Sequence, residues 1–94
     1  MHYVVHCIDH EGSSEKRLKY YDDHKKYLSS SPIKTIISGP LLATDDVTMV
    51  GSCFVVEANN ISEVSLFNKN DPFSKANVWK TISIHAFNKR VDNR

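Results

Sequence analysis

His24 and Asp71 are the two side chains in this sequence with the strongest case for acid–base chemistry. His24 stands three residues after Tyr21 and four before Leu28, which places its imidazole on or beside the apolar face of a helix. Histidine changes its charge near neutral pH, so His24 is a candidate general acid and base. The plainer interpretation is a half-buried histidine whose ring is satisfied by a hydrogen bond.

Two aspartates are candidates to support such an imidazole. Asp71 comes directly before Pro72-Phe73, where an aspartate most often starts a turn or caps a helix. Its alternative role is to orient a neighbouring imidazole and to stabilise the charged form of that ring. Asp9 follows the first apolar run and is either an ordinary turn former or an acidic side chain that faces a cleft. The pattern leaves both alternatives open for each aspartate.

The other histidines, the serines and the glycines give no sign of a metal or nucleotide site. His2, His6 and His10 would share one face of a strand, but neighbours in this series would lie about 13 Å apart, too far for one ion. No serine stands in a Gly-x-Ser-x-Gly turn, and the 3 glycines do not cluster into a phosphate-binding loop. We therefore expect no metal and no cofactor.

The two cysteines, Cys7 and Cys53, lie inside apolar, strand-like runs. Small secreted domains usually carry more cysteines at recognisable spacings, so we expect two buried free thiols in a cytosolic protein. A disulfide between adjacent strands is the alternative. The sequence opens with a strand pattern rather than with a charged region followed by an apolar stretch, so no signal peptide is expected.

Composition and charge narrow the class of protein. The 94 residues fit a single domain spanning 1–94, and 40% hydrophobic with 24% charged residues is typical of a globular chain. The net charge of +1 gives no broad basic field, so nucleic acid is not an expected partner. The longest apolar runs are about five residues, far below the ~20 of a membrane helix. We expect a soluble, cytoplasmic protein with no membrane partner.

The periodicity of the apolar residues predicts how these side chains are positioned. The apolar residues of the first helix, Leu18, Tyr21 and Leu28, mark one helical face. Gly39-Pro40 is expected to end the second strand, and Asn60 is expected to cap the second helix. The expected elements are a strand over 2–8, a helix to about residue 29, strands over 34–38 and 49–57, a helix from 61 to about 68, a short helical turn to 76, and a strand over 78–87.

This order of elements predicts an α+β fold of the ferredoxin-like type, β-α-β-β-α-β. Two split β-α-β units with right-handed crossovers give an antiparallel sheet of four strands with both helices on one face. The other face of the sheet carries apolar side chains and has no cover. It is a candidate surface for a homodimer with barrel-like packing of two sheets.

Several short motifs, in this order and at this spacing, resemble the YciI-like (YCII-related) family over nearly the whole chain. They are Tyr3-Val4-Val5 followed by Asp9, Glu15-Lys16-Arg17-Leu18 followed by His24 and Leu28, Gly39-Pro40, Gly51-Ser52, Asp71-Pro72-Phe73, and the last strand from Val78 to Phe87. The resemblance implies a dimeric ferredoxin-like α/β fold with a cleft.

The resemblance also implies roles for individual residues. The catalytic pair would be His24 and Asp71, with Asp9 as a further acidic candidate. The other matched residues would shape or line the ligand pocket: Arg17, Gly39, Pro40, Ser52 and Phe73. Related members include enzymes that act on small oxygenated aromatic or lactone compounds, by isomerisation or dehydrochlorination.

Two departures from the family pattern bear on substrate choice. Ala86 precedes Phe87 where the family often has proline, and the segment between Pro40 and Gly51 is short and acidic and could border the cleft. Two hypotheses follow from the sequence. The chain is either a small-molecule enzyme that uses its His/Asp pair for proton transfer, or a non-catalytic dimeric module with a metabolite-binding or regulatory role.

Overall fold

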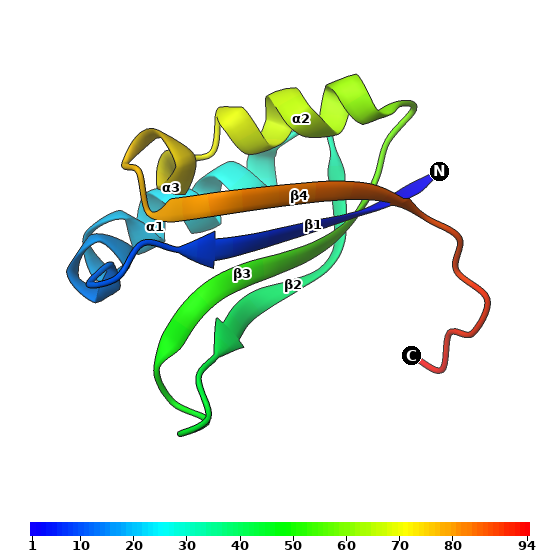
Figure 1. The fold of residues 1–94 in the computed structure, drawn as a ribbon. Coiled ribbons are helices and arrows are strands. Elements are labelled where there is room, and N and C mark those ends of the chain that lie inside the picture. Colours follow the sequence, from blue (N-terminus) through cyan, green and yellow to red (C-terminus); the bar gives the residue numbers. More distant parts are fainter.

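The computed structural model describes all residues from 1 to 94 and confirms the predicted α+β fold (Figure 1). The three helices lie on one face of a single sheet. In chain order the elements are β1 (His2–Asp9), α1 (Ser14–Ser30), β2 (Lys34–Leu42), β3 (Met49–Glu57), α2 (Ile61–Lys69), α3 (Pro72–Lys75) and β4 (Trp79–Phe87). None of the helices is long and apolar enough to cross a membrane.

The sheet has the strand order β2-β3-β1-β4, and every neighbouring pair is antiparallel. Val5 in the central strand β1 pairs with Phe54 of β3 and with Ile84 of β4, so these three side chains share the face under the helices. Val4 and the residues opposite it point to the uncovered face. Burial therefore alternates along β1, with Tyr3, Val5 and Cys7 on the core face.

The core lies between this face of the sheet and the helices α2 and α3. Val5 and Val56 from the sheet and Val64 from α2 are fully buried, and Phe54 and Phe73 are only 2% exposed. The predicted cap of α2 is confirmed, because the Asn60 side chain accepts a hydrogen bond from the Glu63 amide at 3.0 Å. This cap fixes the start of the helix whose buried side covers the centre of the sheet.

The second strand is longer than the sequence predicted. Gly39-Pro40 does not end it, and β2 continues to Leu42, with Gly39 opposite Cys53 and Pro40 opposite Ser52. A proline normally interrupts a ladder because it has no amide hydrogen. However, β2 is an edge strand, where the missing donor can face solvent at no cost to the sheet.

The two cysteines are both free, and they lie on opposite faces of the sheet. Cys7 pairs with Ser52 on the covered face, whereas Cys53 pairs with His6 and points away from the helices. Cys7 is fully buried, and burial raises the pKa of its thiol to about 12. Cys53 is only half-buried, so the expectation of burial is confirmed for Cys7 alone.

Candidate active site

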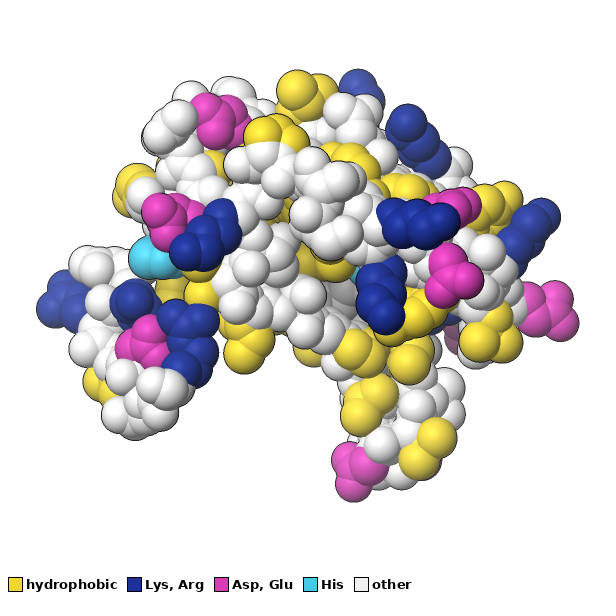
Figure 2. Space-filling model, turned by 180° about the vertical axis from the view of Figure 1, so that it is seen from behind, with side chains coloured by type: hydrophobic (Ala, Val, Ile, Leu, Met, Phe, Trp, Pro, Cys, Tyr) yellow, Lys and Arg dark blue, Asp and Glu magenta, His cyan; other side chains and the backbone are white.

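Part of the apolar face of α1 does not pack into the core, although Leu28 does. Leu18 is 81% exposed and Tyr21 is 51% exposed, and the buried positions of the helix are instead Arg17 and His24. The exposed apolar side chains face the β2–β3 hairpin across a cleft of about 560 Å³, a size typical of small-ligand sites. Figure 2 shows hydrophobic side chains gathered between α1 and this hairpin.

His24 and Asp71 meet at the inner wall of this cleft. His24 Nδ1 lies 2.8 Å from Asp71 Oδ1 and 2.9 Å from Asp71 Oδ2. Asp71 is 1% exposed, and its Oδ1 also accepts a hydrogen bond from the Phe73 amide at 2.8 Å. The Asp-Pro-Phe motif therefore caps α3 and holds the imidazole with the same carboxylate, so the two roles that the sequence left as alternatives coexist.

The surroundings of His24 fix which ring nitrogen is free. A carboxylate can only accept hydrogen bonds, so Nδ1 carries the hydrogen that Asp71 accepts. The ring stacks on Phe73 with centroids 4.1 Å apart and planes 4° from parallel. Nε2 has no partner and is not among the buried unsatisfied atoms, so it stays accessible from the cleft that His24 lines. A neutral His24 thus presents a proton acceptor to any ligand there.

A second buried network forms around Arg17. Its Nε and Nη2 donate to the two carboxylate oxygens of Asp9 at 2.6 and 2.9 Å, in the forked geometry that suits guanidinium and carboxylate groups. Arg17 Nη2 also donates to the Gly51 carbonyl at 2.6 Å and to Ser52 Oγ at 2.9 Å, so its two hydrogens are shared among three acceptors. Trp79 Nε1 donates to the same Ser52 oxygen at 3.2 Å. These contacts join α1 to three strands at one end of the cleft.

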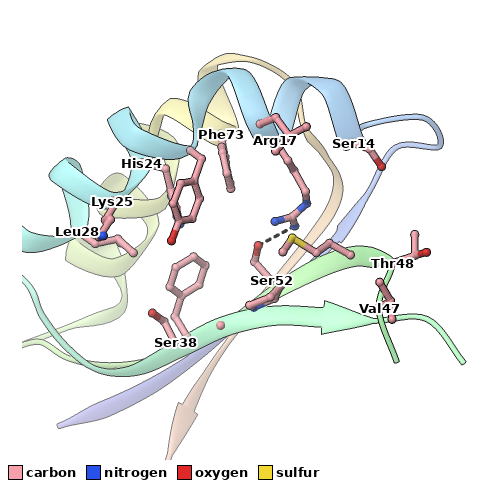
Figure 3. A pocket seen from close by; sticks show the side chains of 16 residues that line it. Ser14, Arg17, His24, Lys25, Leu28, Ser38, Val47, Thr48, Ser52 and Phe73 are labelled. Carbon is pink, nitrogen blue, oxygen red and sulfur yellow. Dashed lines mark hydrogen bonds between the residues drawn. The ribbon is translucent and has the colours of Figure 1, made fainter. Parts of the chain in front are cut away.

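Phe73 lies in contact with both networks. The Arg17 guanidinium carbon is 5.2 Å from the centroid of the same Phe73 ring on which His24 stacks. In Figure 3, Arg17 and His24 extend from α1 toward the cleft, and Ser52 approaches Arg17 from β3. Because the guanidinium and the imidazole are both held by buried carboxylates, their orientation is set before any ligand binds.

The structure brings most of the residues predicted from the sequence to this cleft. Its walls include His24 and all five residues that were expected to shape or line the pocket: Arg17, Gly39, Pro40, Ser52 and Phe73. Asp71 and Asp9 do not line the cleft; Asp71 lies behind the His24 imidazole and Asp9 lies behind the Arg17 guanidinium. Asp9 therefore contacts Arg17 rather than the space where a ligand would lie.

Several cleft residues were not singled out from the sequence as pocket residues. The spacing of Leu18, Tyr21 and Leu28 marked one helical face. Nothing in the sequence indicated that this face borders a cleft. Lys25 follows the same face, seven residues after Leu18. The remaining lining residues are Ser14, Ser38, Val47, Thr48, Met49 and Phe54.

The outer rim of the cleft is the tip of the β2–β3 hairpin, which Asp45 holds in shape. Its carboxylate accepts hydrogen bonds from the Thr48 hydroxyl at 2.5 Å and from the Thr48 and Val47 amides at 2.8 and 2.9 Å. These bonds, the one from the Thr48 hydroxyl first, lower the pKa of Asp45 to about 2. The short acidic segment thus borders the cleft through Val47 and Thr48.

No group of three or more His, Cys, Asp or Glu side chains comes together in the structure in a way that could hold a metal ion. The polar side chains of the cleft are one imidazole, one guanidinium, one ammonium and several hydroxyls. They can donate hydrogen bonds, accept a proton at His24, and attract negative charge.

Comparison with known proteins identifies the family. The model of the YCII-related domain matches residues 1–88. The chain belongs to the YCII-related family. A search of curated proteins finds no match to this YCII-related chain.

Solved structures include two similar folds. The first is 5-chloro-2-hydroxyhydroquinone dehydrochlorinase (TftG) from Burkholderia phenoliruptrix AC1100, solved as a complex with 2,5-dihydroxybenzoquinone. It is 30% identical to this YCII-related protein, with a TM-score of 0.80 over 94% of each chain. The second is At3g17210 from Arabidopsis thaliana, with 9% identity and a TM-score of 0.54 over 99% of this chain and 98% of the other. At that identity the second likeness concerns the fold alone.

Proposed function

We propose that this YCII-related protein is an enzyme that moves a proton on a small cyclic, oxygenated organic compound, with His24 as general acid and base. The observation that carries the proposal is the pairing of His24 Nδ1 with the buried Asp71 carboxylate at 2.8 Å, which leaves Nε2 facing the cleft. General acid–base catalysis by one positioned side chain contributes typically 10²–10⁴-fold to the rate.

Asp71 is the positioning residue in this proposal. Its two oxygens hold the imidazole in the Nδ1–H form, so that Nε2 is ready to take a proton. When Nε2 takes the proton, the ring becomes a cation beside a carboxylate that is 1% exposed. In such a dry position the negative charge stabilises the cation more strongly than it would in water. The proposed step needs neither a metal nor a nucleotide.

The substrate class comes from the shape of the cleft and from the relative. Tyr21, Leu18 and Met49 supply exposed apolar surface, and the cleft volume of about 560 Å³ exceeds what one small ring requires. The relative at 30% identity is named as a dehydrochlorinase of a chlorinated hydroxyhydroquinone and holds a dihydroxybenzoquinone. We propose hydroxylated six-membered rings first, and lactones of similar size second.

The test begins with a ligand screen. Hydroxyquinones, chlorinated hydroquinones and small lactones are added to the protein, and the shift in its melting temperature identifies those that bind. Turnover of each ligand is then followed for the wild type, His24→Gln and the control His85→Gln. His85 is exposed on β4 and does not line the cleft, so its substitution removes an imidazole without changing the cleft; because His85 lies opposite Val4 on the uncovered face of the sheet, the oligomeric state of this control is compared with that of the wild type.

The two hypotheses predict different results. For an enzyme, His24→Gln lowers turnover at least 100-fold while His85→Gln retains it. If the screen yields tight ligands, none of which is turned over by the wild type, the protein is the non-catalytic binding module and the proposed enzyme function is wrong. Equal turnover by all three proteins would also contradict the proposal.

We further propose that two copies associate through the uncovered face of the sheet. Register places Ile37, Val55 and Val4 side by side on this face, and Ile37 is 55% exposed. A charge introduced on this face would have to be buried in the dimer. Ile37→Lys should therefore yield a monomer by analytical ultracentrifugation, whereas a wild-type monomer would refute the proposal. The cytoplasmic location stays a prediction from the sequence.

A further inference from the structure

The hydroxyl hydrogen of Ser52 is not donated to any acceptor in the protein. A serine hydroxyl offers one donor and two acceptor positions. Both acceptor positions of Ser52 are used, by Arg17 Nη2 at 2.9 Å and by Trp79 Nε1 at 3.2 Å. Ser52 donates no hydrogen bond within the protein, although the residue is only 4% exposed. Two accepted bonds polarise a hydroxyl and make it a better donor.

Arg17 also has hydrogen-bond donors that no group in the protein accepts. Its Nε and Nη2 make every hydrogen bond of the side chain, to Asp9, Gly51 and Ser52, and Nη1 makes none. The side chain is only 7% exposed. Among the buried side-chain nitrogen and oxygen atoms, only Thr35 Oγ1 lacks a hydrogen-bond partner. Arg17 Nη1 also lacks a partner, so it does not belong to the buried atoms and stays in contact with solvent. Because Arg17 lines the cleft, its two unused N–H groups are accessible to a ligand there.

The side chains that line the cleft and can carry a charge near neutral pH are all basic. Lys25 lines it and forms no ion pair, and Arg17 and His24 line it with their aspartates behind them. No carboxylate lines the cleft. A ligand with negative charge would therefore find donors and cations but no opposing acid, in a place partly shielded from water.

We propose that Arg17 Nη1 and the Ser52 hydroxyl together form a subsite for a negatively charged oxygen of the substrate. The proposal rests on the proposed function of His24 as the proton-transfer group. It adds which residues stabilise the negative charge that forms on the substrate oxygen. The substrate class it defines is a cyclic compound that ionises as an enolate or a phenolate. Arg17 and His24 are two helical turns apart on α1, about 10 Å along the axis, and both contact Phe73.

The step balances within the substrate and His24. Nε2 removes a proton from a ring carbon next to a carbonyl group, and the electrons of that C–H bond form a carbon–carbon double bond. The electrons of the C=O double bond move onto oxygen, and the resulting oxyanion accepts hydrogen bonds from Arg17 and Ser52. Return of the proton from Nε2 to another carbon of the same conjugated system restores the carbonyl group and yields an isomer. Preorganised donors at such an oxygen are a large source of catalytic power.

The test uses 4-nitrophenol, whose ionised form absorbs visible light, as a probe of the subsite. The pKa of the bound probe is read from its absorbance during a pH titration with saturating protein. We expect it to be at least one unit below that of the free probe, because tenfold tighter binding of the phenolate corresponds to one unit. Ser52→Ala should remove at least half of the shift, with unchanged affinity for the neutral phenol.

The matched control is Ser38→Ala, which removes the same hydroxyl from the same cleft. Ser38 is exposed and its hydroxyl has no hydrogen bond, so the shift should stay within a few tenths of a unit. A second variant, Arg17→Lys, keeps the charge but loses the fork that Asp9 holds. It should reduce the shift like Ser52→Ala, and loss of affinity for both forms of the probe would instead indicate structural damage.

The outcomes separate this proposal from the one it rests on. His24→Gln should leave the shift of the probe in place while it abolishes turnover. Turnover that survives His24→Gln refutes the acid–base function and not the oxygen subsite. An unshifted probe, no binding of either form, or equal shifts in the Ser52 and Ser38 variants overturns the oxygen subsite.

Discussion

Substitution of Asp71 by asparagine separates the two tasks of this carboxylate, because the two oxygens have different partners. Oδ1 accepts from the Phe73 amide and from His24, whereas Oδ2 contacts His24 alone at 2.9 Å. In Asp71→Asn the amide oxygen can still accept from Phe73, and the amide nitrogen takes the place of Oδ2. That nitrogen is a donor facing His24 Nδ1, and the remaining oxygen already accepts from Phe73, so we expect Nδ1 to become the acceptor and the hydrogen to move to Nε2.

The expected magnitudes follow from what each variant leaves unpaired. Asp71→Asn keeps the cap of α3 and a bond to His24, so we expect a loss of about 1 kcal/mol in the free energy of unfolding. Asp71→Ala removes the cap and leaves two buried N–H groups without acceptors, which costs about 3 kcal/mol. For a domain of this size each kcal/mol lowers the melting temperature by about 4–8 °C. Both variants should lose turnover by a similar factor, of the order of 10²–10⁴.

Two measurements check this pair of variants. Urea unfolding followed by circular dichroism gives the stabilities, and ¹⁵N NMR of the imidazole distinguishes the two neutral forms of the ring. We expect the wild type to carry its hydrogen on Nδ1 and Asp71→Asn to carry it on Nε2. If the asparagine variant keeps the wild-type form of the ring and full turnover, then Asp71 does not position His24 and the reasoning is refuted.

Three further predictions concern the rim of the cleft, the thiols and the hairpin. Lys25→Gln should weaken binding of an anionic ligand about two- to fivefold at low salt, as suits an exposed charge, and Lys26→Gln should not; equal effects in calorimetry would contradict this. A thiol reagent at pH 8 should label Cys53 in the monomeric Ile37→Lys variant and leave Cys7 unlabelled until unfolding, because burial holds the pKa of Cys7 at about 12; labelling of Cys7 in the folded protein would contradict this. The Asp45 contribution to the hairpin tip should be complete above the ordinary pKa of 3.8 and disappear as the pH falls toward about 2; amide NMR signals of the tip that change above pH 5 would refute it.

Much of the fold is readable from the sequence, because strand-forming and helix-capping residues mark where several elements lie. The apolar run of β1 and the Asn60 cap of α2 follow from local chemistry, and the structure agrees with both. The length of β2 does not follow, because Gly39-Pro40 normally ends a strand. Only the position of β2 at the edge of the sheet makes that pair acceptable there, and this position is a property of the whole sheet.

The site was predictable to a lesser extent, for a physical reason. Periodicity places Leu18 and Tyr21 on one side of α1, but it cannot tell whether that side meets the core or a cleft. Arg17 and His24 are buried because Asp9 and Asp71 bind them, and each of these pairs joins segments that only the fold brings together. The resemblance to a family, rather than the spacing, suggested that His24 and Asp71 act together.

The central claim, that His24 Nε2 exchanges a proton with a carbon of a cyclic ligand, is open to direct measurement. 2,5-Dihydroxybenzoquinone is dissolved in heavy water with the protein, and ¹H NMR follows the loss of its ring C–H signal above the rate without protein. The account predicts catalysed exchange by the wild type and exchange at least 100-fold slower with His24→Gln. Equal rates for the two proteins, or no catalysed exchange of a ligand that binds, would contradict it.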